Sequence, residues 1–460
     1  MQNPTEQDIA ALRTAQAEFF KSGKTQSLDF RIEALRKLES VLQKRADDVL
    51  AALKSDLGKP GLEAYVAEVF FLLTEIRLFC KKLKRWAKPK RAGHPFYFLP
   101  AKSEIRRKPF GCALVIGPWN YPIQLALSPL VTAVAAGNCV ILKPSEIASS
   151  SSDVLSKIVA EAFDPAHVTV IEGGAEASKL LLDQPFDFIF YTGSKRVGKI
   201  VAEAAAKHLT PTVLELGGKC PCVVGGDVDI EMTAERIAWA KFFNAGQTCF
   251  SPDFVVVHES IRDELAKKIA GKVSEFYADD PINDFGKIVN DSHYERLSAL
   301  LPRSEAVTKI GEDDPAIRHL APRILPSADW SDEAMQDEIF GPVLPVLGFK
   351  NESDLIPKLR ELSSPLAMYV FSRDQEFCET IINSIRSGSV CINDLTKQSS
   401  NLDLPFGGVG SSGMGRYRGK FGFEAFTYQR PVTRRYFVKD FFATHPPYGN
   451  KLEKMRKFLK

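Results

Sequence analysis

The spacing of apolar residues divides the chain into a helical beginning, a short exposed stretch and a long alternating region. Within the first 86 residues apolar positions recur at intervals of three or four, for example at Leu35, Leu38 and Leu42. This interval is typical of helices that bury one face. Helix-start and helix-stop signals then predict three helices: one from Thr5 to Gly23, one from Ser27 onward, and one from about Leu62 to Trp86.

Extended structure is expected after these helices. Residues 96–99 (Phe-Tyr-Phe-Leu) and Ser103–Arg107 have the composition of two strands in a partly exposed ribbon. Near the other end of the chain, Thr427–Val438 has the same character. We expect this last strand to pair with the earlier ribbon or with a partner subunit.

From Cys112 onward, short apolar runs alternate with segments of helical length. In the first half the runs are Cys112–Ile116, Cys139–Leu142, Val168–Ile171, Phe188–Tyr191 and Thr212–Glu215. In the second half they are Cys222–Val224, Phe254–Val257, Leu344–Phe349, Met368–Phe371 and Ser389–Ile392. Such alternation is typical of βαβ units around parallel sheets. We therefore predict an α/β fold with two Rossmann-like parallel-sheet lobes, divided near Gly217 and Gly218, plus a small β element.

Composition narrows the class of protein. The 460 residues carry 60 basic and 57 acidic side chains, a net charge of +3, so charge gives no reason to expect nucleic acid or an anionic membrane as partner. Eight cysteines without a CxxC pair indicate reduced thiols, and seven histidines without an HExxH pattern give no support for a metal site. The first twenty residues are too charged for a secretory signal, and Pro129 and Gly137 break the longest apolar run, Leu125–Leu142. We expect a cytoplasmic protein without a transmembrane anchor.

Two glycine-rich segments are similar to nucleotide-binding motifs but depart from them. Gly193–Lys199 fits the first part of a phosphate-binding loop, yet Ile200 stands where a magnesium-binding hydroxyl is required. What remains is a strand, a tight turn through Ser194 and a helix start, which either holds a phosphate group or is a plain connection. Gly408–Gly413 fits the GxGxxG pattern, but no βαβ unit follows it, so we expect a mobile connection there.

Three polar residues stand beside apolar strands or helices, where α/β proteins place their chemistry. Cys249 ends the segment Asn-Ala-Gly-Gln-Thr-Cys and is either a nucleophile or a packing cysteine. Glu215 lies at the end of an apolar strand before two glycines, as a general base or as a solvated carboxylate. Asn120, in Pro-Trp-Asn-Tyr-Pro, has an amide that can donate a hydrogen bond to an oxyanion.

Taken together, the motifs resemble those of one enzyme family. The segments PWNYP, LKPSE, YTGSKRVG, LELGGK, NAGQTC, EIFGP and LPFGGVGSSGMG occur in the order and spacing of the NAD(P)-dependent aldehyde dehydrogenase superfamily, over essentially the whole chain. The short N-terminus, the length and the ending His445–Tyr448 are similar to the class 3 group, which acts on medium-chain and aromatic aldehydes as dimers. Class 3 members with a hydrophobic C-terminal anchor differ from this sequence, which stops at Lys460.

The resemblance implies a role for each motif residue. Cys249 would be the nucleophile and Glu215 the general base, while Asn120 and the Cys249 backbone N–H would form the oxyanion hole. The implied cofactor residues are Trp119, Lys143, Glu146, Gly193, Ser194, Gly198, Glu338 and Phe340. The carboxylate of Glu146 favours NAD over NADP. Three aromatic residues near the nucleophile are either an apolar substrate pocket or ordinary core: Tyr121, Trp239 and Phe243.

The implied reaction needs one thiol, one carboxylate, one amide and one dinucleotide. The thiolate adds to the aldehyde, hydride passes to NAD or NADP, and carboxylate-activated water hydrolyses the thioester to the acid. We expect residues 1–86 and 107–217 to bind the dinucleotide, 87–106 and 425–442 to form bridging or oligomerisation strands of a homodimer, and 218–424 to carry the nucleophile. The alternatives are an acylating enzyme that uses coenzyme A, a phosphate-loop NTPase, and a dehydrogenase fold reused for binding.

Overall fold

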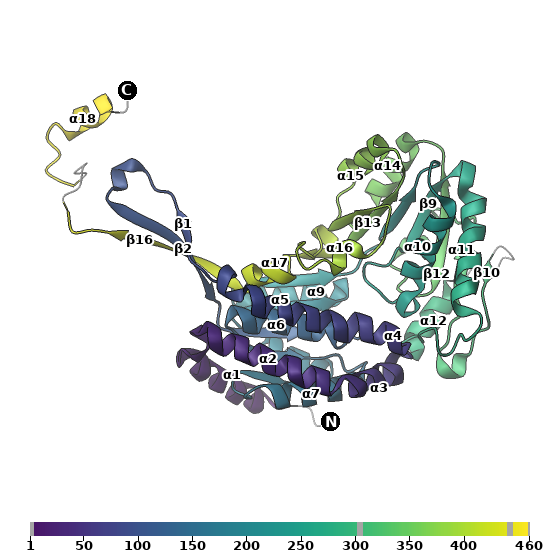
Figure 1. The fold of residues 1–460 in the computed structure, drawn as a ribbon, viewed down its shortest axis with the longest axis horizontal. Coiled ribbons are helices and arrows are strands. Elements are labelled where there is room, and N and C mark those ends of the chain that lie inside the picture. The colour runs from purple at the N-terminus through teal and green to yellow at the C-terminus, as the bar shows by residue number, and fades with distance from the viewer. Residues whose placement is uncertain (1–3, 301–306, 439–444, 459–460) are drawn as a thin grey trace.

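The computed structural model describes residues 4–300, 307–438 and 445–458 and confirms the α/β fold. Within these residues the strands form a six-stranded sheet, a seven-stranded sheet and a three-stranded ribbon. The two larger sheets lie in separate lobes, and the ribbon projects away from both (Figure 1). The chain passes from one lobe to the other between Leu216 and Pro221, as the paired glycines predict.

The first lobe is built on a mostly parallel sheet in the order β15-β7-β6-β3-β4-β5. Its strands are β3 (Cys112–Ile116), β4 (Cys139–Lys143), β5 (Val168–Val170), β6 (Phe188–Gly193), β7 (Thr212–Leu216) and the antiparallel β15 (Gly413–Met414). Apart from β15, these are the predicted strands to within two residues at each end.

Helices cover both faces of this sheet because successive strand residues point to opposite sides. Leu114 and Ile116 pack with α1 (Glu6–Lys21), α8 (Ala175–Leu182) and α9 (Lys195–Lys207). Ala113 and Val115 face the other layer, which contains α2 (Leu28–Lys44), α6 (Gln124–Ala136) and α7 (Ser149–Ala162), with α3 (Ala46–Leu57) and α5 (Phe71–Trp86) beside it. None of the helices in the described ranges is both long and apolar enough to cross a membrane.

The second lobe has the strand order β10-β11-β12-β9-β8-β13-β14. Its strands are β8 (Pro221–Val224), β9 (Phe254–His258), β10 (Thr308–Lys309), β11 (Arg323–Leu325), β12 (Val343–Phe349), β13 (Ala367–Phe371) and β14 (Ser389–Ile392). The main covering helices are α10 (Ile230–Phe242), α11 (Arg262–Tyr277), α14 (Glu352–Glu361) and α15 (Gln375–Ser384). Shorter helices lie in the connections: α12 (Asp291–Ala299), α13 (Glu333–Gln336) and α16 (Lys397–Ser400).

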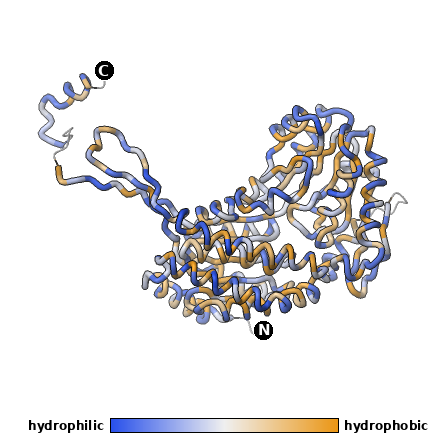
Figure 2. Tube along the Cα trace, in the orientation of Figure 1, coloured by the Kyte–Doolittle hydropathy of each residue, from blue (hydrophilic) through white to orange (hydrophobic). Residues whose placement is uncertain are grey.

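The ribbon consists of β1 (Lys90–Ala92), β2 (Ala101–Pro109) and β16 (Thr427–Arg435), and α17 (Gly419–Ala425) leads into it. β16 runs antiparallel to the whole of β2, which confirms the expected pairing within the chain. The strands of the ribbon are largely hydrophilic, whereas apolar residues gather in the lobes (Figure 2). The last helix, α18 (Lys451–Phe458), lies beside the ribbon tip. The bridging role stays a prediction, and residues 439–442 of that range lie outside the described residues.

Two local predictions are wrong, and a third needs a refinement. Phe96–Phe98 forms a short 3-10 turn rather than a strand, because prolines at 95 and 100 cannot donate to a strand ladder. The glycine-rich connection near 408–413 instead enters the strand β15, where a Cβ on Gly413 would lie 2.2 Å from the carbonyl oxygen of Leu214. The predicted helix over 62–86 begins with α4 (Gly61–Ala64) and contains a π-helical stretch, Tyr65–Phe70.

Candidate active site between the lobes

The fold brings Asn120, Glu215 and Cys249 together where the two lobes meet. Asn120 follows β3, Glu215 lies in β7, and Cys249 follows α10 and the short turn Phe243–Gly246. The Asn120 side chain donates through Nδ2 to the carbonyl of Gln247 at 3.0 Å, two residues before Cys249. The charge of Glu215 also raises the pKa of Cys249. Three residues that are distant in the sequence therefore form one site.

Cys249 is held as a neutral thiol. Burial raises its pKa first, and the nearby carboxylates of Glu338 and Glu215 raise it further, while the Arg418 guanidinium acts in the opposite direction. The residue is still partly exposed, so a small molecule can reach it. Attack on an electrophile thus requires a neighbouring group that removes the thiol proton.

Glu215 is a buried carboxyl group with no hydrogen-bond partner among the described residues. Only 3% of the residue is exposed, and neither Oε1 nor Oε2 is bonded. Burial raises its pKa well above the ordinary value, against the opposing charges of Arg416 and Arg418. Such isolation lowers the stability of the fold and is typical of groups kept for acid–base chemistry. The alternative of a solvated carboxylate at a strand end is therefore wrong.

A buried ion pair behind Asn120 has no motif that marks it in the sequence. Lys59 Nζ is paired with the carboxylate of Glu68 and donates to the backbone carbonyl of Asn120 at 3.0 Å. Glu68 accepts in addition from the backbone N–H groups of Ile123 at 2.9 Å and Gln124 at 3.2 Å. Both charged side chains are completely buried. The pair therefore fixes the backbone before and after the turn that carries Asn120.

The loop before the candidate nucleophile is strained and held in place. Asn244 and Ala245 have left-handed φ angles of 55° and 51°, which side chains disfavour. Glu63 accepts from the Asn244 backbone N–H at 2.8 Å. Asn244 Nδ2 donates to the carbonyls of Asn120 at 3.0 Å and Gln247 at 3.1 Å. Burial raises the pKa of Glu63 to about 7, so the carboxyl group that holds Asn244 gains or loses its charge near neutral pH.

The end of β6 and the start of α9 form the turn at which a phosphate group is expected. Ser194 caps α9, and its Oγ accepts from the Val197 N–H at 3.4 Å. The preceding hydroxyl, Thr192 Oγ1, is buried and has no partner among the described residues. An unpartnered hydroxyl next to the N–H groups of a helix start fits a bound pyrophosphate.

The two glycines of this turn are also required by packing. A Cβ on Gly193 would lie 2.3 Å from the hydroxyl of Tyr191, and one on Gly198 would lie 2.7 Å from Cδ2 of Leu216.

The first lobe supplies a further pair: Lys143 is buried at the end of β4 and donates to Glu146 at 2.9 Å. Glu146 itself is about half exposed and can reach a ligand.

The second lobe places Glu338 and Phe340 against the first. The Glu338 carboxylate lies over Gly217, where a Cβ would be 2.1 Å from Oε2, and burial raises its pKa to about 8. The ring of Phe340 contacts Trp119 edge-on, with centroids 5.3 Å apart. These two contacts join residues of both lobes at the mouth of the site.

Lys219 and Asp253 hold this second-lobe segment in position. Lys219 Nζ donates to Asp253 at 2.6 Å and to the carbonyls of Ala334 at 2.7 Å and Asp337 at 3.0 Å. Asp253 accepts from the backbone N–H of Ile339 at 2.9 Å. The lysine stands in the LELGGK motif, so the sequence contains a signal for it, whereas nothing marks Asp253.

The three proposed pocket aromatics separate into two groups. Trp239 and Phe243 lie on one side of the helix end, with ring centroids 5.4 Å apart, and Trp239 is 41% exposed. Tyr121 is buried, and its hydroxyl bonds to Thr248 Oγ1 at 2.6 Å while Lys59 Nζ lies 4.0 Å from its ring centre. The substrate contact of Trp239 and Phe243 stays a prediction, whereas Tyr121 is bonded to the loop before Cys249.

Comparison with known proteins agrees with this geometry. The model of the "Aldehyde dehydrogenase family" matches residues 1–432. A 4,4'-diaponeurosporen-aldehyde dehydrogenase of Staphylococcus aureus is 40% identical over 96% of this chain and 97% of that protein. The mouse (Mus musculus) aldehyde dehydrogenase family 3 member A2 is 40% identical over 93% of this chain and 87% of that protein. The solved substrate-bound state of Staphylococcus aureus AldH has a TM-score of 0.95 and 39% identity, and the match covers 98% of this chain and 99% of that one.

Proposed function

Because the chain belongs to the aldehyde dehydrogenase family, we propose that it oxidises an aldehyde to the carboxylic acid through Cys249, Glu215 and Asn120. The similarity to a family 3 member agrees with the class 3 resemblance of the motifs. One observation carries the assignment of roles: Glu215 is an unpartnered, buried carboxyl group whose charge acts on the Cys249 thiol. This is the arrangement that a base beside a nucleophile requires.

Capture of the aldehyde begins with loss of the Cys249 proton. Glu215, which has no hydrogen-bond partner among the described residues, accepts this proton once it is ionised and then passes it to water. The sulfur bonds to the aldehyde carbon, and the carbonyl oxygen becomes an oxyanion. The amide of Asn120 retains one N–H beyond its bond to Gln247, and the Cys249 backbone N–H is the second proposed donor. The result is a thiohemiacetal on Cys249.

Glu215 acts again in the second half of the reaction. When bound, NAD or NADP supplies the acceptor for the hydride of the adduct. The thioester that remains on Cys249 is attacked by a water molecule whose proton passes to Glu215. The carbon–sulfur bond breaks, the acid leaves, and the thiol takes up a proton again.

The residues present fit a dinucleotide, and NAD is the favoured form. The unpartnered Thr192 hydroxyl and the start of α9 suit a pyrophosphate. The carboxylate of Glu146 accepts from a ribose 2′-hydroxyl and repels a 2′-phosphate, although its ion pair with Lys143 weakens this preference. The other residues proposed to hold the cofactor are Trp119, Gly193, Ser194, Gly198, Glu338 and Phe340.

The proposed substrate is a medium-chain or aromatic aldehyde. Trp239 and Phe243 present an aromatic surface near the loop of Cys249, and burial of each methylene group against it stabilises binding by at most about 0.8 kcal/mol. We further propose a homodimer joined through the projecting ribbon, because the outer edge of β16 is unpaired among the described residues of a single chain. The cytoplasm is the proposed compartment, since none of the eight cysteines forms a disulfide.

The experiment that tests the mechanism replaces Glu215 by Gln. Because Glu215 is proposed to take the thiol proton before it activates water, we expect the variant to lose the fast release of NAD(P)H as well as steady-state turnover. If Glu215 instead only activates the hydrolytic water, the variant releases about one equivalent of NAD(P)H per site in a fast phase, followed by very slow turnover. Mass spectrometry of the intact protein then finds the acyl group on Cys249.

Two results would contradict the proposal. Normal steady-state turnover of Glu215→Gln would show that this carboxylate has no catalytic role. A wild-type enzyme that turns over only when coenzyme A is added would be an acylating enzyme, and the hydrolytic half of the mechanism would be wrong. Cys249→Ala serves as the control: it binds the dinucleotide but forms neither the acyl-enzyme nor product.

A further inference from the structure

A cavity of about 490 Å³ lies at the base of the ribbon and is lined by none of the candidate active-site residues. Its walls come from the end of α1, the start of α2 and the connection between them, from the segment after α5, from the strands β2 and β16, and from α17. Five lining side chains are basic: Arg31, Arg106, Arg107, Lys108 and Arg430. No aspartate or glutamate belongs to the described residues that line it.

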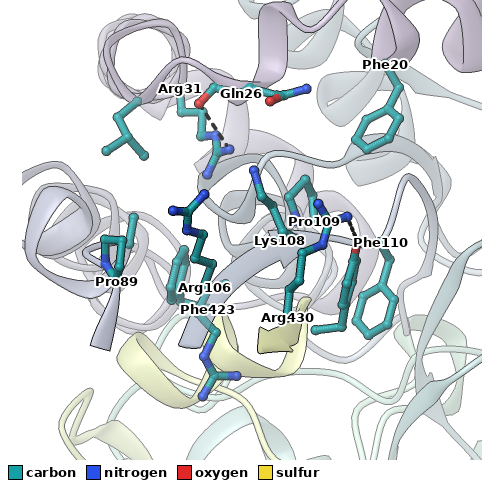
Figure 3. Close-up of a pocket in the computed structure, with 14 residues that line it drawn as sticks. Phe20, Gln26, Arg31, Pro89, Arg106, Lys108, Pro109, Phe110, Phe423 and Arg430 are labelled. Atoms are coloured by element: carbon teal, nitrogen blue, oxygen red, sulfur yellow. Dashed lines mark hydrogen bonds between the residues drawn. The ribbon is translucent and has the colours of Figure 1, made fainter. Parts of the chain in front are cut away.

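The strand register concentrates three of these cations on one face. Arg106 lies directly opposite Arg430 in the ladder between β2 and β16, and Lys108 is the next residue on the same face of β2. Like charges directly opposite each other destabilise an antiparallel pair. Figure 3 shows Arg106 and Lys108 extending toward Arg31, on the other wall of the cavity.

Few of these positive charges have a negative partner. Arg106 pairs with Glu104 and Arg107 with Glu424. The Lys108 side chain has no hydrogen bond or ion pair in the part of the chain that the structure describes. The other two basic residues, Arg31 and Arg430, donate hydrogen bonds to backbone carbonyls and to a hydroxyl.

Within the described residues, Arg31 and Arg430 are bonded only to neutral groups. Arg31 is buried and donates to the backbone carbonyls of Thr25 at 2.5 Å and Ala135 at 3.2 Å, and burial lowers its pKa to about 10. Arg430 donates to the hydroxyl of Tyr428 at 2.6 Å. With Lys108, three positive charges therefore surround the cavity without a carboxylate to balance them.

We propose that this cavity binds a compact oxyanion with two or more negative charges, of the phosphate or polycarboxylate kind. The anion contacts Arg106 and Lys108 on one wall and Arg31 on the other, and it relieves the repulsion between the facing strands. Arg430 and the Tyr428 hydroxyl close the site toward the ribbon. This site does not depend on aldehyde oxidation, so the two proposals stand or fall separately.

The test measures binding of inorganic pyrophosphate, and of citrate in a second arm, by calorimetry and thermal unfolding at constant ionic strength, with saturating NADH present so that the proposed pyrophosphate site at α9 is occupied. We expect saturable binding at one site per chain and a rise in Tm of about 2 °C or more at high occupancy. Arg106→Met and Lys108→Met should each weaken binding about 10-fold or more, because each removes a charge-assisted bond. The double variant should bind neither anion, yet remain as stable as the wild type at low salt. Binding in only one arm identifies the oxyanion as a phosphate or as a polycarboxylate.

Two controls establish that binding is specific to this cavity. Lys102 lies opposite Arg434 farther along the same ribbon, outside the cavity, so Lys102→Met with Arg434→Met removes the same charge and should leave binding intact. Because NADH occupies the proposed dinucleotide site throughout, that site does not contribute to the measured binding. Absence of saturable binding in both arms, or equal loss in both double variants, would overturn the proposal.

Discussion

Cys249 and Glu215 have raised pKa values for one common reason: burial removes the water that would solvate their charged forms. The charge of Glu215 would also raise the pKa of the Cys249 thiol, so this thiol is neutral in the resting site. For a residue whose folded pKa is raised, the neutral form prevails until the pH rises through that raised value. The nucleophile is thus inactive until a proton has left the pair.

Alkylation of the free enzyme tests this state of Cys249. We expect iodoacetamide to react slowly with Cys249 at pH 7, and the rate to rise about tenfold per pH unit to pH 9 and beyond, because only the thiolate reacts. Peptide mass spectrometry measures the rate at each pH, with the partly exposed Cys391 as an internal reference. A rate that levels off below pH 7 would mean that the thiol is already ionised.

The buried Lys59–Glu68 pair offers a second test at the residue scale. Lys59→Met removes the donor to the Asn120 carbonyl and should lower kcat about 100-fold, since small displacements of an oxyanion donor are costly. It should also lower stability by about 3–5 kcal/mol, because Glu68 is left buried without its partner.

A double variant separates these two effects. Lys59→Met with Glu68→Met removes both charges, so the melting temperature should recover while kcat stays low. Lys54→Met, at a surface-exposed lysine of α3, is the matched control and should change neither quantity. Recovery of kcat together with stability would show that the pair only supports the fold.

Motifs were sufficient to predict Asn120, Glu215 and Cys249, but not the residues that hold them. A single lysine or glutamate in a helical segment is solvated in most proteins, so the sequence gives no sign that Lys59 and Glu68 are buried. Only the π-helical stretch and the packing of α6 show that both face inward. Long-range contacts of this kind are absent from any local pattern.

At the scale of elements, the apolar runs located the main strands because buried parallel strands are almost continuously apolar. The strand β15 escaped this rule, since it contains two residues, one of them a glycine. Its pairing depends on the φ of 148° at Gly413 and on the absence of a Cβ beside Leu214. In the register of the sheet, Gly413 lies opposite Glu215.

Gly413→Ala is therefore expected to disturb the candidate base. The added methyl group collides with backbone, so β15 must separate from β7, with a stability loss of about 2 kcal/mol or more and a strongly reduced kcat. Thermal unfolding and steady-state kinetics measure both. Gly174→Ala, where a Cβ meets nothing within 4 Å, is the matched control. Unchanged kinetics in Gly413→Ala would show that β15 does not position Glu215.

At the scale of the whole molecule, the projecting ribbon predicts association of two chains. Phe437, after β16, is fully exposed in a single chain. Few aromatic residues of a stable monomer are exposed to this extent. Sedimentation should give twice the mass of the chain, and Phe437→Asp should shift the equilibrium toward the monomer. Leu209→Asp, at an apolar residue of the first lobe that is 91% exposed, should not. A wild-type monomer at micromolar concentration would contradict the proposed homodimer.

The two-lobed arrangement followed from the sequence, but the path of the chain between the lobes did not. The division at residue 424 stays a prediction, yet β15 joins the sheet of the first lobe and α17 packs on α5 and α6. The spacing of apolar residues does not show which of two similar sheets a later segment joins. The sheet that such a segment joins is determined by contacts between residues that are distant in the sequence.

The return of β15 has a consequence for the time at which activity arises during synthesis. The ribosome completes β7 with Leu216, but the strand that covers its edge is made roughly 200 residues later, which takes about 10–40 s at ordinary rates of translation. Until then the nascent first lobe exposes an open, apolar sheet edge that chaperones recognise. A chain terminated before Gly413 would contain the proposed nucleophile, the proposed base and the proposed phosphate-binding turn, and we expect it to be inactive.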